Sequence, residues 1–284
     1  MTNWWRVLVL MLMAPLTLAS TLSVSERRLI LDGQDNFRDI GGYATDDGRR
    51  VKPGILFRSG SLHQLSPADL RDLELRRIKT VIELRSATEI AAAGKDLLPS
   101  GARPVVIPIS VAVFDKPIRD AIASGNIGVI PPDLHHQLAR SLIIEHTPEV
   151  AEVLNVMLDK ENWPVVVHCD DGGLRTGVVT MLLMTALGVG LDDIKTDFLI
   201  TNIYREIPIR QQMNEVLTAI AMKSGRALST VPESVEALFF MQERDIEAAI
   251  EEASRRYGSV EGYLLRGLKL DPALINSARD AALQ

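Results

Sequence analysis

Short apolar runs alternate along the chain with longer segments of helical periodicity. Residues 80–82, 105–107 and 164–168 are rich in β-branched side chains and predict strands, the last of them buried. Helix starts are expected at Ser66 and Thr147, because each of these capping residues precedes a proline at a first helical position. Strands that alternate with helices imply a mainly parallel sheet covered on both faces, so the predicted fold class is α/β.

The remaining pattern is mostly helical. Residues 178–187 predict an apolar helix that ends at Gly188, and the C-terminal third is helical from Ile207 onward, with residues 232–256 as its longest stretch. Residues 110–146 mix glycines and prolines with apolar positions and are expected to form a mobile cover over the functional site. We expect residues 29–284 to form a single domain, since they hold no repeat and no linker-like tract.

The first 20 residues have the layout of a secretory signal peptide. A single positive charge at Arg6 precedes an apolar run over residues 7–14, and small residues at cleavage spacing follow Pro15. The apolar run is shorter than the ~20 residues of a membrane span. Export with cleavage is therefore predicted, so the protein is expected to be periplasmic or secreted. The alternatives are an uncleaved N-terminal anchor facing outside the cytoplasm and a buried helix.

The composition argues against nucleic acid as a partner and against disulfides or zinc sites as stabilising cross-links. The 284 residues include 31 basic and 37 acidic side chains, a formal net charge of −6, and no long run of Lys or Arg. This balance argues against nucleic acid as a partner. The single cysteine, Cys169, can form neither an internal disulfide nor a multi-thiolate zinc site.

The candidate chemistry lies between the predicted strand that ends at His168 and the apolar helix that follows. In a parallel α/β sheet, such a turn lies at the carboxyl ends of the strands, where ligands bind. A tight loop that leads into a helix directs its backbone N–H groups toward one point, which predicts an anion cradle. The expected phosphate-binding residues are Asp170, Asp171, Gly172, Gly173, Leu174 and Arg175.

Cys169 is the expected nucleophile of this loop. The electrostatic field of the cradle should lower the pKa of its thiol, which predicts a thiolate at neutral pH. Arg175 offers a planar fork to two phosphoryl oxygens, and the Thr176 hydroxyl can hydrogen-bond the sulfur or help it leave. His168 is expected to order the loop rather than act as a base, since strand alternation turns its side chain away from that of Cys169. The alternative, a buried cysteine that acts as a small hydrophobe, is less favoured because the whole pattern occurs together.

With these residues the chain resembles the cysteine-dependent protein tyrosine phosphatases that carry an H-C-x5-R-T signature, and within them the bacterial branch of secreted or lipid-active phosphatases. Four further motifs match in order: N-F-R-D-x-G-G at 36–42, L-F-R-S at 56–59, L-R-S-x-x-E at 84–89, and Y-G-S with Y-L at 257–264. The resemblance implies a phosphatase fold, phosphomonoester hydrolysis and no cofactor.

Two departures from that branch bear on substrate choice. Gly173 and Leu174 stand where the branch commonly carries Lys-Asp, and the missing lysine is the one that the family uses toward phosphoinositides. The acid at the end of the first strand is Glu83, where the relatives have Asp. The first departure predicts a preference for phosphotyrosine or aryl phosphate over phosphoinositide.

Glu83 is the expected general acid, because it closes a strand at the edge of the site and could protonate the leaving oxygen. The alternative for Glu83 is an ion pair with a neighbouring arginine. Asp39 and Asp197 are weaker candidates for the same role.

Several other polar residues have a mainly structural interpretation. Arg38, Arg58 and Arg85 either bind phosphate or organise carboxylates, and the second role is favoured. His63, His135, His136 and His146 show no metal-ligand spacing with a carboxylate, so no metal is expected.

The predicted reaction is therefore a two-step hydrolysis in which Cys169 attacks phosphorus and water cleaves the phosphocysteine. The expected partners are a phosphorylated protein or a small phosphate ester, with membrane contact only if the N-terminal segment is retained. The alternatives are a phosphate-binding module without catalysis and a phosphoinositide phosphatase. Arsenate reduction through a similar loop is disfavoured, because it normally needs additional cysteines.

Overall fold

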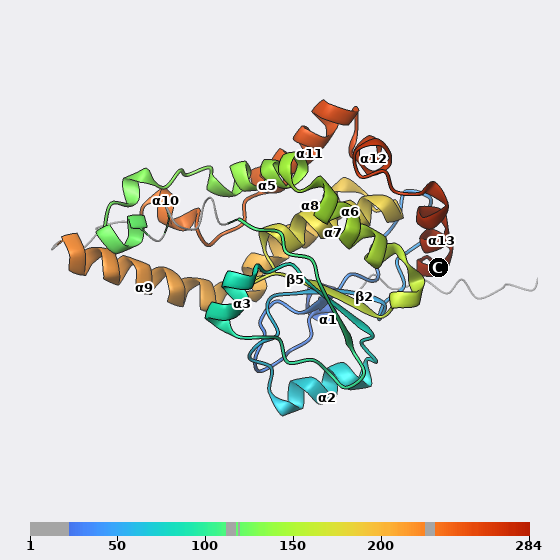
Figure 1. Cartoon of the computed structure of the whole chain (residues 1–284), viewed down its shortest axis with the longest axis horizontal. Helices are drawn as coiled ribbons and strands as arrows, with labels where there is room; N and C mark the ends of the chain where they lie inside the picture. The colour runs from blue at the N-terminus through green and yellow to red at the C-terminus, as the bar shows by residue number, and fades with distance from the viewer. Residues whose placement is uncertain (1–22, 112–117, 119, 225–230) are drawn as a thin grey trace, which may run out of the picture.

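The computed structural model describes residues 23–111, 118, 120–224 and 231–284. The described residues form one sheet of five strands, which lies near the middle of the molecule (Figure 1). The strands are β1 (Arg38–Asp39), β2 (Leu56–Ser59), β3 (Thr80–Glu83), β4 (Arg103–Val106) and β5 (Val165–His168), in the spatial order β1-β2-β5-β3-β4. Only β1 pairs antiparallel, with β2, and the other neighbours are parallel. The predicted α/β class with a mainly parallel sheet is confirmed.

Strand alternation divides the apolar residues of the sheet between its two faces. Phe57, Val81 and Val166 belong to a smaller core that includes Leu73 of helix α2 (Pro67–Leu75). Alternate strand positions such as Val167 belong to the main core on the opposite face. That face is covered by α5 (Leu134–Glu145), α6 (Thr147–Leu158), α7 (Leu174–Leu187), α8 (Leu191–Tyr204), α11 (Glu243–Tyr257) and α13 (Pro272–Ala282) (Figure 1).

Helix α7 lies between the sheet and the outer helices, and 13 of its 14 residues are buried. A helix in such a position has no polar face, which explains its apolar sequence. Gly177 allows α8 to approach closely, since a Cβ there would lie 2.5 Å from the ring of Phe198. The sequence pattern placed the start of this helix four residues too late, because its first turn is the polar end of the loop after β5.

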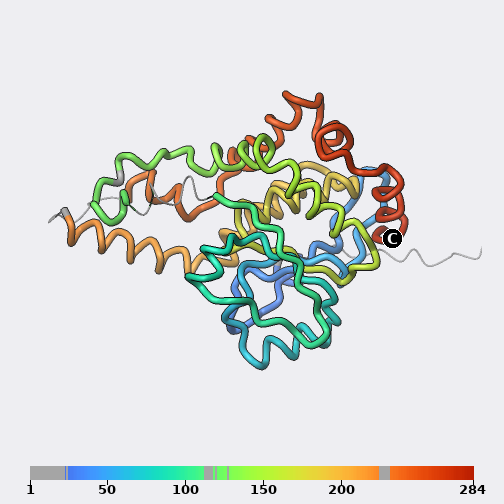
Figure 2. The backbone as a smooth tube through the Cα atoms, in the orientation of Figure 1, coloured from blue at the N-terminus to red at the C-terminus, as the bar shows by residue number. Residues whose placement is uncertain are grey.

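Helices α9 (Glu206–Ser224) and α10 (Glu233–Glu236) extend away from the sheet, beside the green segment that precedes α5 (Figure 2). Met213 and Ile220 of α9 form a separate small core with Val235 of α10. The remaining short helices are α1 (Val24–Arg27), α3 (Ala87–Ala93), η1 (Ile127–Val129), η2 (Lys160–Asn162), α12 (Val260–Gly262) and η3 (Tyr263–Gly267).

One expectation about the elements is wrong, and two strands were not predicted. Residues 232–256 do not form the longest helical stretch: they divide into α10 and α11 around an irregular turn, and Gln242 caps α11. The longest helix is instead α9, with 19 residues among those described. Strands β1 and β2 were not predicted, because their polar residues Arg38 and Arg58 interrupt the apolar pattern.

The predicted signal peptide, residues 1–20, lies outside the described part of the chain. Among the helices that the structure describes, none has the length and apolar character that a membrane crossing requires.

Candidate active site

The loop 169–173 connects the end of β5 to the first residue of α7. The sequence predicts a turn between these two elements, but with a later start of the helix. Gly172 has φ of +71°, and a Cβ at this position would lie 2.4 Å from the carbonyl oxygen of Ser59 on the neighbouring strand β2. A side chain here would require both an unfavourable backbone conformation and a clash with main-chain atoms. Gly172 therefore allows the loop to pass directly over the end of β2.

Cys169 lies beneath this loop and is 1% exposed. Burial raises the pKa of its thiol and the Asp171 carboxylate raises it further, while Arg175 and the Thr176 hydroxyl oppose the shift. The thiol donates a hydrogen bond to Asp171 Oδ1 over 3.6 Å. This shift is opposite in direction to the lowered thiol pKa that the sequence predicts, because burial is its largest cause and outweighs the positive charge of Arg175. That Cys169 reacts as a thiolate at neutral pH stays a prediction.

Arg175 follows the same loop, and its guanidinium makes two hydrogen bonds to one carboxylate. Its Nη1 and Nη2 donate to Glu89 Oε2 at 3.0 Å and Oε1 at 2.5 Å, and Nη1 also donates to the Ile109 carbonyl at 3.1 Å. Burial opposes ionisation of Glu89, yet this pairing leaves its pKa below the usual value. Glu89 also accepts a hydrogen bond from the backbone N–H of Ser86, which completes a capping box at the start of α3.

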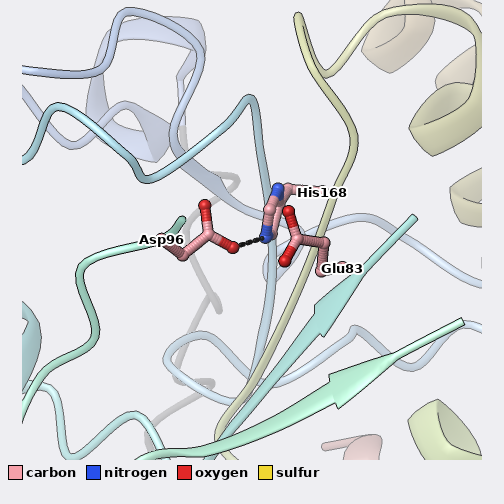
Figure 3. Close-up of side chains that lie close together, drawn as sticks. All are labelled: Glu83, Asp96 and His168. Carbon is pink, nitrogen blue, oxygen red and sulfur yellow. Dashed lines mark ion pairs between the residues drawn. The ribbon is translucent and has the colours of Figure 1, made fainter. Parts of the chain in front are cut away.

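His168 connects the loop to a polar network behind it (Figure 3). Its Nδ1 lies 3.1 Å from the carbonyl oxygen of Cys169, and its Nε2 lies 2.8 Å from Asp96 Oδ2. The imidazole therefore lies between the Asp96 carboxylate and the carbonyl oxygen of the cysteine. The role of His168 as a residue that orders the loop stays a prediction, which these two contacts support.

Glu83 lies with His168 rather than with Cys169. The two residues are register partners on adjacent parallel strands, so their side chains share one face of the sheet, opposite to that of Cys169. Arg85 Nε donates to Glu83 Oε1 at 2.6 Å, which is the ion pair that the sequence left open. Glu83 lines a separate cavity of about 250 Å³, so the structure does not bring this predicted general acid to the cysteine.

Glu83, Asp96 and His168 also form a group whose donor atoms lie within 4.8 Å of one another, close enough to hold a metal ion (Figure 3). Arg85 makes ion pairs with both carboxylates of this group, at 3.0 Å from Asp96 Oδ1. Its guanidinium already supplies the positive charge that two buried carboxylates need. We assign no metal to this group.

Arg38, Arg58 and Asp197 form a buried charged cluster under the loop. Asp197 accepts from Arg38 Nε at 3.1 Å and from Arg58 Nη1 at 2.5 Å. Burial alone would raise the pKa of Asp197, but the two guanidinium groups lower it to about 2. Arg58 Nη2 also donates to the Gly172 carbonyl at 2.8 Å. The two arginines therefore organise a carboxylate and the loop, and Asp197 is an ionised structural residue rather than an acid.

Asp39, the remaining candidate acid, accepts hydrogen bonds from the backbone N–H groups of Gly41 at 2.7 Å and Gly54 at 2.6 Å. Burial raises the pKa of its carboxyl group. Nearby, Asn36 Nδ2 donates to the Asp171 carbonyl at 3.0 Å. The N-F-R-D segment thus supports the loop from outside and contributes no side chain to the cavity.

A cavity of about 280 Å³ opens in front of the loop. Its apolar wall is formed by Val111, Leu138, Leu174, Leu238, Phe239 and Met241, and its polar lining by Glu89, His135, Asp170, Asp171, Arg175, Arg205 and Gln212. Three of these residues come from the segment 110–146, so the predicted cover does reach the site. Sequence reasoning did not place Glu89, His135 or Arg205 in the site. For Glu89 two signals were available, the L-R-S-x-x-E motif and the capping pattern that begins at Ser86. His135 and Arg205 have no such local signal, since α5 and the end of α8 bring them to the loop.

The fold and this site define a phosphatase of the cysteine-dependent class. The chain belongs to the tyrosine phosphatase family, whose model matches residues 29–284.

Two relatives and two solved structures are similar to this chain to different degrees. A protein of Cupriavidus necator named as a tyrosine-protein phosphatase is 30% identical over 86% of this chain and 85% of its own length. The triple specificity protein phosphatase PtpB of Mycobacterium tuberculosis is 26% identical over 89% of this chain and 98% of its own length. The catalytic domain of the PP-IP phosphatase SIW14 of S. cerevisiae is 15% identical, with a TM-score of 0.34, over 69% of this chain and 96% of that domain. TpbA of P. aeruginosa is 14% identical, with a TM-score of 0.31, over 62% of this chain and 90% of that chain.

Proposed function

We propose that the protein hydrolyses phosphomonoesters through a phosphocysteine formed on Cys169. The observation that carries the proposal is the turn from strand β5 to helix α7, which holds the buried thiol of Cys169 and, six residues later, Arg175 at the cavity. A loop of this kind, which leads into a helix N-terminus, is suited to binding a phosphoryl group beside the sulfur. A module that only binds phosphate would have the amides and the arginine but would not need the sulfur. Release of phosphate from an aryl phosphate in the presence of EDTA separates the two functions, since no metal takes part.

The reaction has two steps. The Cys169 thiol first loses its proton to solvent, and the thiolate attacks phosphorus in line while the loop amides and Arg175 hold the equatorial oxygens. The bond from phosphorus to the leaving oxygen breaks, and a carboxylic acid gives that oxygen its proton. Water then attacks the phosphocysteine and gives a proton back to the carboxylate, which releases inorganic phosphate and the Cys169 thiolate. Glu89 keeps the Arg175 fork oriented in the absence of substrate.

The general acid has to come from a carboxyl group that faces the cavity. Glu89 is paired with Arg175, and Asp171 is in contact with the sulfur itself rather than with the leaving-group side. Asp170 lines the cavity next to the nucleophile, and desolvation together with the carboxylates of Asp171 and Glu89 raises its pKa. A raised pKa keeps a carboxylic acid protonated at a higher pH, as a general acid requires. We therefore assign the role of general acid to Asp170 in place of Glu83.

The lining of the cavity favours an aromatic substrate. Leu174, Phe239 and Met241 offer a ring an apolar contact next to the cradle. Each cationic side chain of the lining already faces a carboxylate, Arg175 with Glu89 and Arg205 with Asp171. Little unpaired positive charge is left for a polyanionic head group, so phosphotyrosine or an aryl phosphate should be preferred over a phosphoinositide.

The preference is measured as kcat/KM for a phosphotyrosine peptide and for a soluble phosphoinositide at two ionic strengths. We expect the peptide to be the better substrate by about tenfold or more, because one buried ring contributes on the order of 1 to 2 kcal/mol. Activity on the phosphoinositide should rise with salt as repulsion is screened. A phosphoinositide preference that persists at low salt would refute the charge argument.

Export remains a proposal that rests on residues 1–20 alone. A positive residue, an apolar run and small residues at cleavage spacing support removal of roughly the first 19 or 20 residues. Intact-mass analysis of the protein from its host would detect that loss in the exported fraction. A full-length species in the cytosol would contradict the proposal.

A further inference from the structure

The Asp171 carboxylate occupies the inside of the phosphate cradle. Its Oδ1 lies 3.6 Å from Cys169 Sγ and accepts the backbone N–H of Gly173 at 2.9 Å. Its Oδ2 lies 3.3 Å from Nη1 of Arg205, a buried side chain that follows α8. One carboxylate thus contacts the nucleophile, a cradle amide and a cation at the same time.

These contacts coincide with those of a substrate oxygen. A sulfur about 3 to 3.5 Å from phosphorus lies at a similar distance from the equatorial phosphoryl oxygens, while the leaving oxygen is farther away on the opposite side. Asp171 Oδ1 therefore takes the place of an equatorial oxygen, bound to the amide that such an oxygen would use. A phosphoryl group cannot enter the cradle fully until this carboxylate moves out.

Gly173 makes this arrangement possible. A Cβ at position 173 would lie 2.9 Å from Asp171 Oδ2, 3.2 Å from Oδ1 and 3.2 Å from Met241 Sδ. A side chain at 173 would therefore force the carboxylate to shift from the position in which it contacts the sulfur. The absence of a side chain at Gly173 thus provides the space that the Asp171 carboxylate occupies.

We propose that Asp171 is a specificity-determining residue. Its carboxylate competes with the phosphoryl group for the Gly173 N–H and for Arg205. Only a ligand that gains binding energy from additional contacts in the cavity displaces this carboxylate. The inference rests on the proposed function, since it assigns a role within that same cradle. A phosphate ester with a ring gains contacts with the apolar wall and can use them to displace the carboxylate. Free phosphate has no such contacts, so it should bind weakly and leave quickly.

The test measures orthophosphate binding by isothermal titration calorimetry and thiol reactivity by alkylation with neutral iodoacetamide as a function of pH. Asp171→Asn is expected to bind phosphate about tenfold more tightly, because a charged competitor is removed. The midpoint of its alkylation profile should move to lower pH, since a negative charge next to the thiolate is lost. Cys169 is the single cysteine of the chain, so alkylation reports on this site alone.

Two further variants make the result specific. Asp170→Asn makes the same exchange of side chain at the adjacent loop position, where there is no contact to Sγ, and should change phosphate affinity and the alkylation midpoint less than Asp171→Asn does. Gly173→Ala keeps both aspartates and forces the Asp171 carboxylate to shift by steric contact, so it should also tighten phosphate binding.

Phosphate affinity that is unchanged or weaker in both Asp171→Asn and Gly173→Ala, with wild-type thermal unfolding, would overturn the inference. Equal effects of Asp170→Asn and Asp171→Asn would also overturn it, because they would show a general charge effect. Neither readout depends on turnover. A protein that shows the expected shifts but hydrolyses no ester would refute the proposed function and leave this inference standing.

Discussion

Replacement of Cys169 by serine is expected to remove almost all turnover while the fold stays intact. A hydroxyl at this position is a far weaker nucleophile than sulfur near neutral pH, and loss of a nucleophile costs several orders of magnitude in kcat. The substitution exchanges one small buried side chain for another, so packing beneath the loop changes little. The measurement is kcat on an aryl phosphate, with thermal unfolding of both proteins as the control for folding.

The same variant separates chemistry from binding. Arg175, Gly172 and the loop amides are untouched by Cys169→Ser, so orthophosphate should still bind. A serine variant that keeps more than about a tenth of the wild-type kcat would refute the phosphocysteine mechanism. A variant that loses phosphate binding and unfolds at a lower temperature would instead show that the sulfur is needed for packing.

The parts of the fold that follow from local sequence were predictable. Strand β5 is a short apolar run and helix α7 a long one, with a glycine-containing turn between them, and this pattern predicted the position of the candidate site. Strand β2 was not predicted, because Arg58 interrupts its apolar run. The residues near Arg58 in the sequence do not show that its charge is neutralised by Asp197, which is 139 residues away. A charge that pairs with a residue far away in the sequence cannot be recognised as buried from its sequence neighbours.

The same limit explains the errors at the site. The nucleophile, the arginine fork and the orienting histidine are adjacent in sequence, so their roles could be predicted together. Glu83 seemed suitable because it ends a strand at the correct edge of the sheet, but the register with β5 places its side chain beside His168. The effect of Asp171 on the thiol depends on a side-chain conformation that motif spacing does not specify. Arg205 reaches the loop from the end of α8, 34 residues beyond Asp171.

Asp170 and Glu83 are the two candidates for the general acid, and the variants Asp170→Asn and Glu83→Gln distinguish them. If Asp170 protonates the leaving oxygen, Asp170→Asn should lower kcat by about 10²- to 10⁴-fold, which is the usual contribution of a general acid. The loss should shrink for esters whose leaving groups are more acidic, because these need less help from a proton donor. Glu83→Gln keeps a side chain of the same size beside Arg85 and should not show this dependence on the leaving group.

The pH dependence of kcat gives an independent readout of the same assignment. A general acid works in its protonated form, so kcat of the wild type should fall as pH rises through the pKa of that group. Because desolvation and the neighbouring carboxylates raise the pKa of Asp170, this fall should lie above the usual range for an aspartic acid. The descending limb should disappear in Asp170→Asn and persist in Glu83→Gln. The opposite pattern, in which only Glu83→Gln loses the descending limb, would identify Glu83 as the general acid. It would also require the segment around His168 to move toward the cavity during turnover.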